Sequence, residues 1–499
     1  MDYKKDLLFI IIFIVIYIII NKNILNNENS KSENEIYYDI IYNTSKNDSK
    51  SLSLKDVCGC EETKIQINDV IDYIKNPELY INMGAKLPKG ILLEGKPGTG
   101  KTLMIKALSN ECSIPVITVY VSNLCDTYVG VGAQRVRNIF LKARKLSPCI
   151  VFFDEIDSIG TMRDYSSNSN SERVVTLNAI LNEIDGFNNL ENVIVIAATN
   201  KADKLDPALV RPGRFDKKIT VNLPDRKDRE DLFKYYLSKV KTIEDINLVS
   251  NEFSNLTSGF SGAEIANIVN ESAIIAVRNK NNNVTKKDIN EAYEIHILGL
   301  KKIRGNLSFY EERIVAFHEA GHAFLQSVLK YVSQVSRVSI EPRVKSALGY
   351  SQSEPDEKNL NSKQEIIHQI SILLGGRIVE SIVNDNLVTT GAYDDLKKIN
   401  ILLKNYVQIF GFDKQHGRLV ISDSNDKQNT SDMLSYEIEQ HCRRILKDIE
   451  LETYNIIRTN FNYIQEIAGL LIKNKNIYND DLSKIIGDEL IDSYEIIID

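Results

Sequence analysis

Several features that would place this 499-residue chain in a special class are missing. Tryptophan is absent, and the six cysteines are too few and too scattered for a disulfide framework. Cys58-Gly-Cys60 lacks both the C-x-x-C spacing and a second pair of cysteines, so we interpret it as structural. The formal net charge of −7 gives no general attraction to nucleic acid. No repeat of about 20 to 50 residues is present. These absences favour an ordinary folded protein of a reducing compartment.

A short apolar run at residues 7–20 is the first positive feature, with Lys4 and Lys5 before it and Lys22 after it. As a helix it reaches about 21 Å, less than the roughly 30 Å of a hydrocarbon core. A cleaved secretory signal is the alternative, but no small-residue cleavage pattern follows the run. We expect residues 1–22 to be a tail and transmembrane anchor whose orientation the flanking lysines leave open. Residues 23–53 are polar and are predicted to be a linker.

A glycine-rich motif lies between a strand pattern at residues 90–94 and a helical pattern at residues 103–110. The motif is the G-x-x-x-x-G-K-T sequence Gly95-Lys96-Pro97-Gly98-Thr99-Gly100-Lys101-Thr102. In this context its glycines let backbone N–H groups turn toward phosphates, and Lys101 reaches the terminal phosphates. The hydroxyl of Thr102 is suited to Mg²⁺. The stretch therefore predicts a P loop that binds a nucleotide with Mg²⁺, and a plain glycine turn is the alternative.

Two further apolar strand patterns end in polar residues. Residues 149–155 end in Asp154 and Glu155, and residues 193–200 end in Asn200. Strands that are apolar throughout belong in a parallel sheet, whose carboxyl ends face the ligand. We expect Asp154 to hold Mg²⁺, Glu155 to polarise the attacking water and Asn200 to position it. Residues 117–121 and 219–223 complete a predicted five-stranded sheet.

A second kind of site is indicated by the H-E-x-x-H sequence of His318, Glu319 and His322. On a helix of about 3.6 residues per turn both imidazoles lie on one face and can share a metal, with Glu319 placed to take a proton from a metal-bound water. Ser308 and Glu311 form a capping box that predicts where this helix begins. The motif also arises by chance in long chains, although the chain has only six histidines. A catalytic zinc needs a third protein ligand, which the motif does not supply.

These motifs together resemble one known family. G-K-P-G-T-G-K-T, F-F-D-E-I-D, A-A-T-N and R-P-G-R-F-D look like an AAA+ ATPase, and H-E-A-G-H follows downstream. From about residue 54 to about residue 472 the chain resembles the FtsH family of membrane-bound, ATP-dependent zinc metalloproteases. The resemblance implies an α/β P-loop AAA+ domain with a helical lid, then a mainly α-helical zinc metalloprotease domain of the M41 type. The expected boundaries of these parts are 54–230 for the α/β domain, 231–300 for the lid and 301–499 for the protease.

The resemblance also implies a ring and a central pore. Arg211 and Arg214 match the family's arginine fingers, which act on the neighbouring subunit's nucleotide. A homo-hexamer, or a hetero-hexamer with paralogues, is therefore expected. Tyr128, Val129 and Gly130 match the loop that lines the pore, where an aromatic ring on a loop with a glycine can grip an extended chain.

The third metal ligand is likewise an implication of the resemblance. Residues 389–396, T-T-G-A-Y-D-D-L, match the family's T-G-A-x-x-D-L pattern, whose second acid binds zinc. This nominates Asp395 and leaves Asp394 as a neighbour. The A-L-G-Y of residues 347–350 resembles a segment near the protease cleft, where an edge strand could pair with an extended substrate. The sequence departs from the family at Lys96, which replaces a proline, and at residues 342–349, which lack a glycine and are one residue longer.

The sequence thus predicts a membrane-anchored, ATP-dependent zinc metalloendopeptidase that unfolds, translocates and degrades membrane and soluble proteins in quality control. Its expected cofactors are one Zn²⁺ per subunit, ATP and Mg²⁺, and its expected partners are misfolded or unassembled proteins. Two alternatives stay open: an ATP-driven remodeller or translocation motor with an inert protease half, and a soluble protease with a cleaved leader. The anchor implies a single-pass protein with both domains on the ATP-containing side. The membrane is expected to be bacterial or that of an organelle, plastid or mitochondrial. The chain is rich in Asn, Ile, Lys and Tyr, as proteins of AT-rich genomes are, and this mildly favours an organelle.

Overall fold

The computed structural model describes residues 38–41, 53–85, 88–124, 130–160, 170–186, 193–302, 308–343, 349–353, 358, 360–385, 387–412, 432–487 and 489–498. The predicted anchor and most of the predicted linker lie outside these ranges. The chain divides into two compact units, one of Met1–Tyr235 with Gly259–Ala266 and one of Tyr236–Ser258 with Asn267–Asp499.

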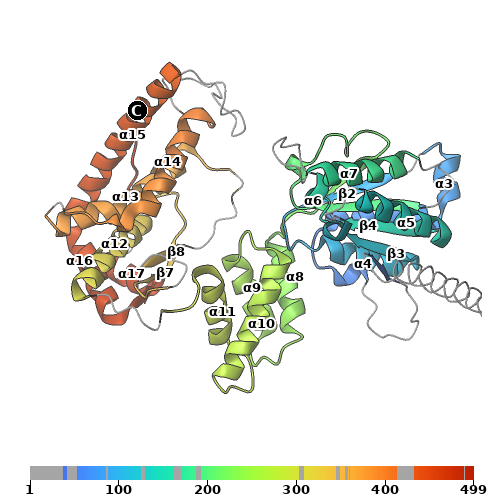
Figure 1. The fold of residues 1–499 in the computed structure, drawn as a ribbon. Coiled ribbons are helices and arrows are strands. Elements are labelled where there is room, and N and C mark those ends of the chain that lie inside the picture. Colours follow the sequence, from blue (N-terminus) through green and yellow to red (C-terminus); the bar gives the residue numbers. More distant parts are fainter. Residues whose placement is uncertain are drawn as a thin grey trace, which may run out of the picture. The chain divides into compact units, whose positions relative to one another are not determined.

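A six-stranded sheet forms the centre of the first unit, with the strand order β1-β3-β4-β5-β2-β6 (Figure 1). Its strands are β1 (Asp39–Ile41), β2 (Gly90–Glu94), β3 (Val116–Tyr120), β4 (Cys149–Asp154), β5 (Val193–Thr199) and β6 (Phe215–Thr220). All neighbouring pairs are parallel except β1 with β3. The carboxyl ends of β2, β4 and β5 therefore share one edge, where the predicted nucleotide residues lie.

Two details of the predicted sheet were wrong. The sheet has six strands instead of five, because Asp39–Ile41, in the predicted linker, pairs antiparallel with β3. Three residues are too few to show a hydrophobic period, so the sequence alone could not predict this edge strand. It forms by pairing with β3, which is distant in sequence. The last strand runs Phe215–Thr220 instead of 219–223. Its exposed positions are polar because it lies at the edge of the sheet, so its first half lacks the fully apolar pattern from which the other strands were predicted.

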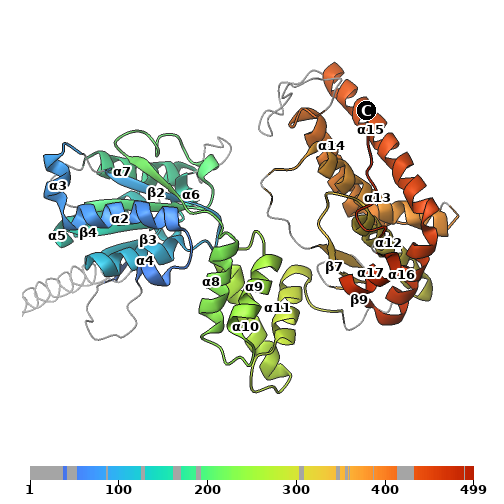
Figure 2. The ribbon, with the colours of Figure 1, turned by 180° about the vertical axis from the view of Figure 1, so that it is seen from behind.

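Helices cover both faces of this sheet. They are α2 (Glu61–Lys75), α3 (Pro77–Asn82), α4 (Lys101–Cys112), α5 (Val131–Leu146), α6 (Asp157–Gly160) and α7 (Asn170–Asp185). Alternate strand residues feed two separate cores: Phe153 packs with residues of α5 and α7, whereas Phe152 packs with residues of α2 and α4. The helices α5 and α7 are in front of the sheet in Figure 1, and α2 and α4 are in front in Figure 2. The α/β prediction is confirmed by this layering.

Four helices follow the sheet: α8 (Arg226–Leu237), α9 (Ile246–Leu256), α10 (Gly262–Arg278) and α11 (Lys286–Leu298). They agree with the predicted helical lid, although α8 begins five residues before the expected boundary at 231. A capping box between Thr285 and Asp288 fixes the start of α11.

The described residues from 308 onward, all in the second unit, are mainly helical. Its helices are α12 (Phe309–Val328), α13 (Lys363–Val383), α14 (Tyr393–Gln408), α15 (Asp432–Thr459), α16 (Phe461–Asn474) and α17 (Asn479–Ile486). Strands β7 (Val335–Ser339), β8 (Tyr350–Ser353) and β9 (Asn476–Tyr478) form a small antiparallel sheet in the order β8-β7-β9. A three-residue strand such as β9 shows no pattern in the sequence and forms through its pairing with β7. The capping box of Ser308 and Glu311 at the start of α12 is confirmed.

Helices α12 and α13 cross closely at two glycines. A Cβ atom on Gly321 would lie 2.7 Å from the carbonyl oxygen of Gly375, and a Cβ on Gly375 would lie 2.5 Å from Leu325 Cδ1. Only residues without side chains allow this approach. Both helices contribute many buried apolar residues to the core of the unit, so this crossing fixes its centre.

Within the described ranges, α13 is the one helix long and apolar enough to cross a membrane. Six of its residues, Ile366, Ile367, Ile370, Leu374, Ile378 and Val379, lie in the protein core instead. Its apolar character is therefore explained by packing against α12.

We expect Gly321→Ala to destabilise the second unit by about 1–3 kcal/mol, because the added methyl group meets the backbone of Gly375 as well as the Val379 side chain, and the backbone cannot move aside. The midpoint of thermal unfolding of the full chain, measured by calorimetry, checks this. Gly469→Ala in α16 is the matched control, since nothing lies within 4 Å of its Cβ position. The control should raise stability slightly, as alanine favours a helix. An equal response of the two variants would contradict the role of the crossing.

Candidate metal centre and nucleotide site

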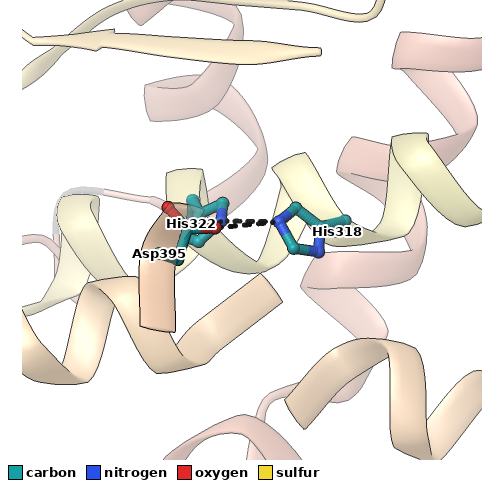
Figure 3. Close-up of side chains that lie close together, drawn as sticks. All are labelled: His318, His322 and Asp395. Carbon is teal, nitrogen blue, oxygen red and sulfur yellow. Dashed lines mark hydrogen bonds and ion pairs between the residues drawn. The ribbon is translucent and has the colours of Figure 1, made fainter. Parts of the chain in front are cut away.

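Two histidines of α12 and an aspartate of α14 converge in the second unit (Figure 3). The Nε2 atoms of His318 and His322 are 3.0 Å apart, as their spacing of one helical turn predicts. Asp395 Oδ2 lies 3.4 Å from His318 Nε2 and 3.5 Å from His322 Nε2. The structure thus brings together the three residues nominated from the sequence.

The outer nitrogens of both imidazoles have their own partners. His318 Nδ1 lies 2.9 Å from Glu380 Oε1, and His322 Nδ1 lies 2.7 Å from the carbonyl oxygen of Ile372. These partners can only accept, so each Nδ1 carries the proton and each neutral Nε2 presents a lone pair. When both imidazoles are neutral, two lone pairs and the carboxylate of Asp395 face one another with no donor between them. A cation is the group that satisfies such a set, and two imidazoles with one carboxylate suit Zn²⁺.

The ionisable groups of the site shift one another's pKa values. Burial opposes a charge on His318, but the carboxylates of Asp395 and Glu380 outweigh it and raise the pKa of His318 to about 10. For Asp395 burial is again opposed, here by hydrogen bonds from His318 and His322, and its pKa falls well below the ordinary value. Each shift expresses the same demand for positive charge among these three groups.

Glu319 lies beside this cluster and is almost fully buried. Burial raises its pKa, while the imidazoles of His322 and His318 act in the opposite direction. A Cβ atom on Gly349 would lie 2.7 Å from both Cγ and Oε1 of Glu319, so the chain entering β8 passes directly against this carboxylate. This places β8 next to the residue that the motif nominated as proton acceptor.

The backbone of Gly376 forms one side of the cluster of His318, His322 and Asp395. A Cβ atom on Gly376 would lie 2.5 Å from His318 Cε1 and 2.6 Å from the Nε2 atoms of His318 and His322. Sequence reasoning assigned no role to Gly376 or Glu380. Their roles depend on how α13 crosses α12, and no local pattern reports that crossing.

The P loop lies in the first unit, between β2 and α4. Lys101 Nζ donates to the carbonyl oxygens of Gly95 and Lys96 at 2.8 and 2.9 Å, and to Asn200 Oδ1 at 2.7 Å. Burial lowers the pKa of Lys101, and the nearby Asp154 opposes this. Gly98 and Gly100 have φ values of 79° and 93°, which let the loop curve around an anion.

The residues predicted to handle Mg²⁺ and water meet at the same edge. Thr102 Oγ1 donates to Asp154 Oδ2 at 2.9 Å, which joins the P loop to the end of β4. Glu155 follows directly with φ 56°, a costly backbone angle for a residue with a side chain. Strain of this kind is a feature of functional positions. Sequence reasoning missed Ser261, whose Oγ lies 2.7 Å from a Cβ position on Gly98, so the start of α10 also touches the P loop.

The predicted arginine fingers differ in their surroundings. Arg214 binds both carboxylate oxygens of Asp185 through Nε, and its Nη1 donates to the carbonyl oxygen of Ala208. The Arg211 side chain is exposed. Of the predicted pore loop, Tyr128 and Val129 lie outside the described residues, and Gly130 is the N-cap of α5 with φ 96°.

Comparisons with known proteins agree with this arrangement. Residues 91–223 match the ATPase family associated with various cellular activities (AAA), residues 245–291 match the AAA+ lid domain, and residues 306–485 match peptidase family M41. The chain is 38% identical to "ATP-dependent zinc metalloprotease FTSH 10, mitochondrial" of Arabidopsis thaliana, covering 90% of this chain and 56% of that protein.

Bacterial proteins match equally well. The "ATP-dependent zinc metalloprotease FtsH" of Clostridium perfringens is 38% identical, over 87% of this chain and 61% of its own length. The protein of the same name from Endomicrobium trichonymphae is 39% identical, over 89% of this chain and 72% of its own length. The chain therefore spans between about half and three quarters of the length of these relatives.

We expect Asp395→Asn to weaken zinc binding more than about 100-fold, because an amide oxygen cannot supply the negative charge of the third ligand. Zinc content after dialysis against a graded chelator, measured by atomic absorption, checks this. Asp394→Asn is the matched control, since Asp394 is exposed and adjacent in sequence but not part of the cluster. Equal zinc loss in both variants would contradict the assignment of Asp395.

Proposed function

Because the chain belongs to the FtsH family of ATP-dependent zinc metalloproteases, we propose that it is an ATP-dependent zinc endopeptidase that unfolds and degrades proteins. The observation that carries the proposal is the convergence of His318, His322 and Asp395 beside the buried Glu319. A remodelling motor with an inert protease half would have no need of this set of groups.

We assign His318, His322 and Asp395 as the zinc ligands. Bound there, zinc would lower the pKa of its water toward ~7 and would polarise the peptide carbonyl. Glu319 would take the proton of that water and pass it to the leaving amine. Glu380 holds His318, and the Ile372 carbonyl holds His322, with the Nε2 atoms facing the cluster. The path of the chain at Gly349 against Glu319 supports β8 as the edge strand that an extended substrate joins.

We assign the P loop, residues 95–102, to the phosphates of ATP. In this assignment Lys101 exchanges its carbonyl and Asn200 partners for phosphate oxygens, and Thr102 with Asp154 holds Mg²⁺. Glu155 polarises the attacking water and Asn200 positions it. The shared edge of β2, β4 and β5 supports this grouping.

The ring is part of the same proposal. Arg211 and Arg214 would act on a neighbouring subunit's nucleotide in a homo-hexamer or a hetero-hexamer with paralogues. Arg211 is the exposed member of the pair, whereas Arg214 would first leave Asp185. Tyr128, Val129 and Gly130 would line the pore and pull substrate chains toward the zinc. We keep 54–230, 231–300 and 301–499 as the boundaries of the α/β domain, lid and protease.

The membrane anchor at residues 7–20 completes the proposal. It suggests misassembled membrane proteins as substrates, beside soluble ones, with both domains on the ATP-containing side of a bacterial or organelle membrane. Extraction of the native protein with and without detergent tests the anchor.

We expect Glu319→Gln to slow casein degradation about 100-fold or more while ATP hydrolysis continues, because an amide cannot accept the proton of the attacking water. Fluorescent casein with ATP, Mg²⁺ and zinc provides the measurement. Glu466→Gln, at an exposed position of α16, is the matched control and should keep wild-type rates.

The same assay separates the proposal from the remodelling alternative. If the wild type hydrolyses ATP but leaves casein intact with zinc bound, the protease half is inert and the proposal is wrong.

We expect Glu155→Gln to slow ATP hydrolysis about 100-fold or more while ATP still binds. Degradation of a folded substrate should stop, whereas short peptides that need no unfolding should still be cleaved. Phosphate release, nucleotide binding and the two cleavage assays are measured side by side. Normal degradation of the folded substrate by this variant would contradict the assigned role of ATP.

A further inference from the structure

A pocket of about 630 Å³ adjoins the metal cluster in the second unit. Its wall includes Ile372, whose carbonyl oxygen holds His322, and Lys398, which lies 3.8 Å from the carboxylate of Asp395. Gln326 also lines it, one turn of α12 beyond His322. The pocket is therefore a direct continuation of the face of α12 that carries the metal ligands.

The pocket also adjoins the strand proposed to receive substrate. Ser353, the last residue of β8, lines it, and Gly349 at the other end of this short segment lies against Glu319. A substrate strand paired with β8 would run from Glu319 to the mouth of the pocket. Since side chains of a strand alternate between faces, one residue flanking the cleaved bond would point its side chain toward α12 and α13.

Gln326 is the distinctive group of this pocket, because it is a polar side chain only 7% exposed. Its amide nitrogen donates to the carbonyl oxygen of Ser333 at 2.7 Å and to Ser353 Oγ at 2.6 Å. The Ser333 carbonyl can only accept, which fixes the orientation of the amide. Both amide hydrogens are then used. Among the described residues no donor reaches the amide oxygen, and Gln326 lines the pocket.

The remaining lining restricts what can satisfy that oxygen. Leu373, Ile401 and Leu402 provide apolar wall, which favours a large side chain with an apolar body. The one carboxylate of the lining, Glu365, is paired with Lys358 at 3.2 Å, and Lys398 also lines the pocket, so the wall offers a cation no free negative charge. The unpaired acceptor oxygen of Gln326 disfavours a carboxylate. A bulky, neutral side chain with a donor at its far end is left, and tyrosine has these properties.

We infer that Gln326 makes this pocket a specificity subsite for a tyrosine flanking the cleaved bond, with the tyrosine hydroxyl donating to the Gln326 oxygen. The inference rests on the proposed protease function and adds a preference that depends on one residue. The pocket is larger than one side chain, so the neighbouring substrate backbone or water shares it.

The test uses the zinc-loaded full chain. Casein cleavage sites are first mapped by mass spectrometry, and failure at this step would sink the proposed function and not the subsite. Fluorogenic peptides are then made that differ only at the two positions flanking the bond, carrying Tyr, Phe, Leu, Lys or Glu. We expect Tyr to exceed Phe about three- to tenfold in kcat/KM at one of these positions, the usual effect of one neutral hydrogen bond.

Two variants test whether the preference for Tyr over Phe depends on the pocket. Gln326→Met keeps the length of the side chain and removes the acceptor, so the Tyr to Phe ratio should fall to about one while Phe and Leu peptides are still cut. Gln440→Met, at an exposed position of α15, should keep the wild-type ratio. Zinc content and melting temperature confirm that each variant is folded.

Two results would overturn the inference. One is a wild-type enzyme that cuts Tyr and Phe peptides equally at both positions, or prefers Lys or Glu. The other is a folded Gln326→Met enzyme with an unchanged ratio. If Gln326→Met does not fold, Ile401→Trp takes its place, because Ile401 is 53% exposed and the larger ring fills the pocket. A Tyr preference unaffected by Ile401→Trp would place the subsite elsewhere.

Discussion

The need for positive charge among His318, His322 and Asp395 is the constraint on which the second unit depends. The Nδ1 protons of the two histidines are directed outward to Glu380 and to the Ile372 carbonyl, so in the neutral imidazoles the Nε2 lone pairs and the Asp395 carboxylate face inward. Such an arrangement is costly without a positive charge at its centre. Zinc binding and the stability of this part of the fold are therefore expected to be coupled.

The close crossing of α12 and α13 makes that arrangement possible. Gly321 and Gly375 let the helices approach, and Gly376 presents bare backbone to both imidazoles. The same approach brings Glu380 to His318 and Ile372 to His322. One packing contact thus sets the positions of the two histidines proposed as metal ligands, of their hydrogen-bond partners and of part of the pocket wall beside them. The glycines of the P loop serve a different purpose, since there positive φ angles turn the backbone.

Both sites join residues distant in sequence by the same physical means. Lys101 meets Asn200 and Thr102 meets Asp154 because parallel strands end at one edge of a sheet. This could be predicted, since apolar strands followed by polar residues have few other arrangements. The strands β1 and β9 could not, because each has three residues and exists only through pairing with β3 or β7.

The sequence by itself determined the P loop, the four central strands of the sheet, the helix that carries His318, Glu319 and His322, and its capping box. These features are local, and the spacing of a few residues decides them. The family resemblance nominated Asp395 over Asp394, but only the tertiary structure showed that Asp395 reaches the histidines, that Glu380 orients one of them, and that Gln326 offers an unpaired oxygen beside them. Those facts depend on how helices far apart in the chain cross, and helix crossing is set by packing in three dimensions, which no local spacing encodes.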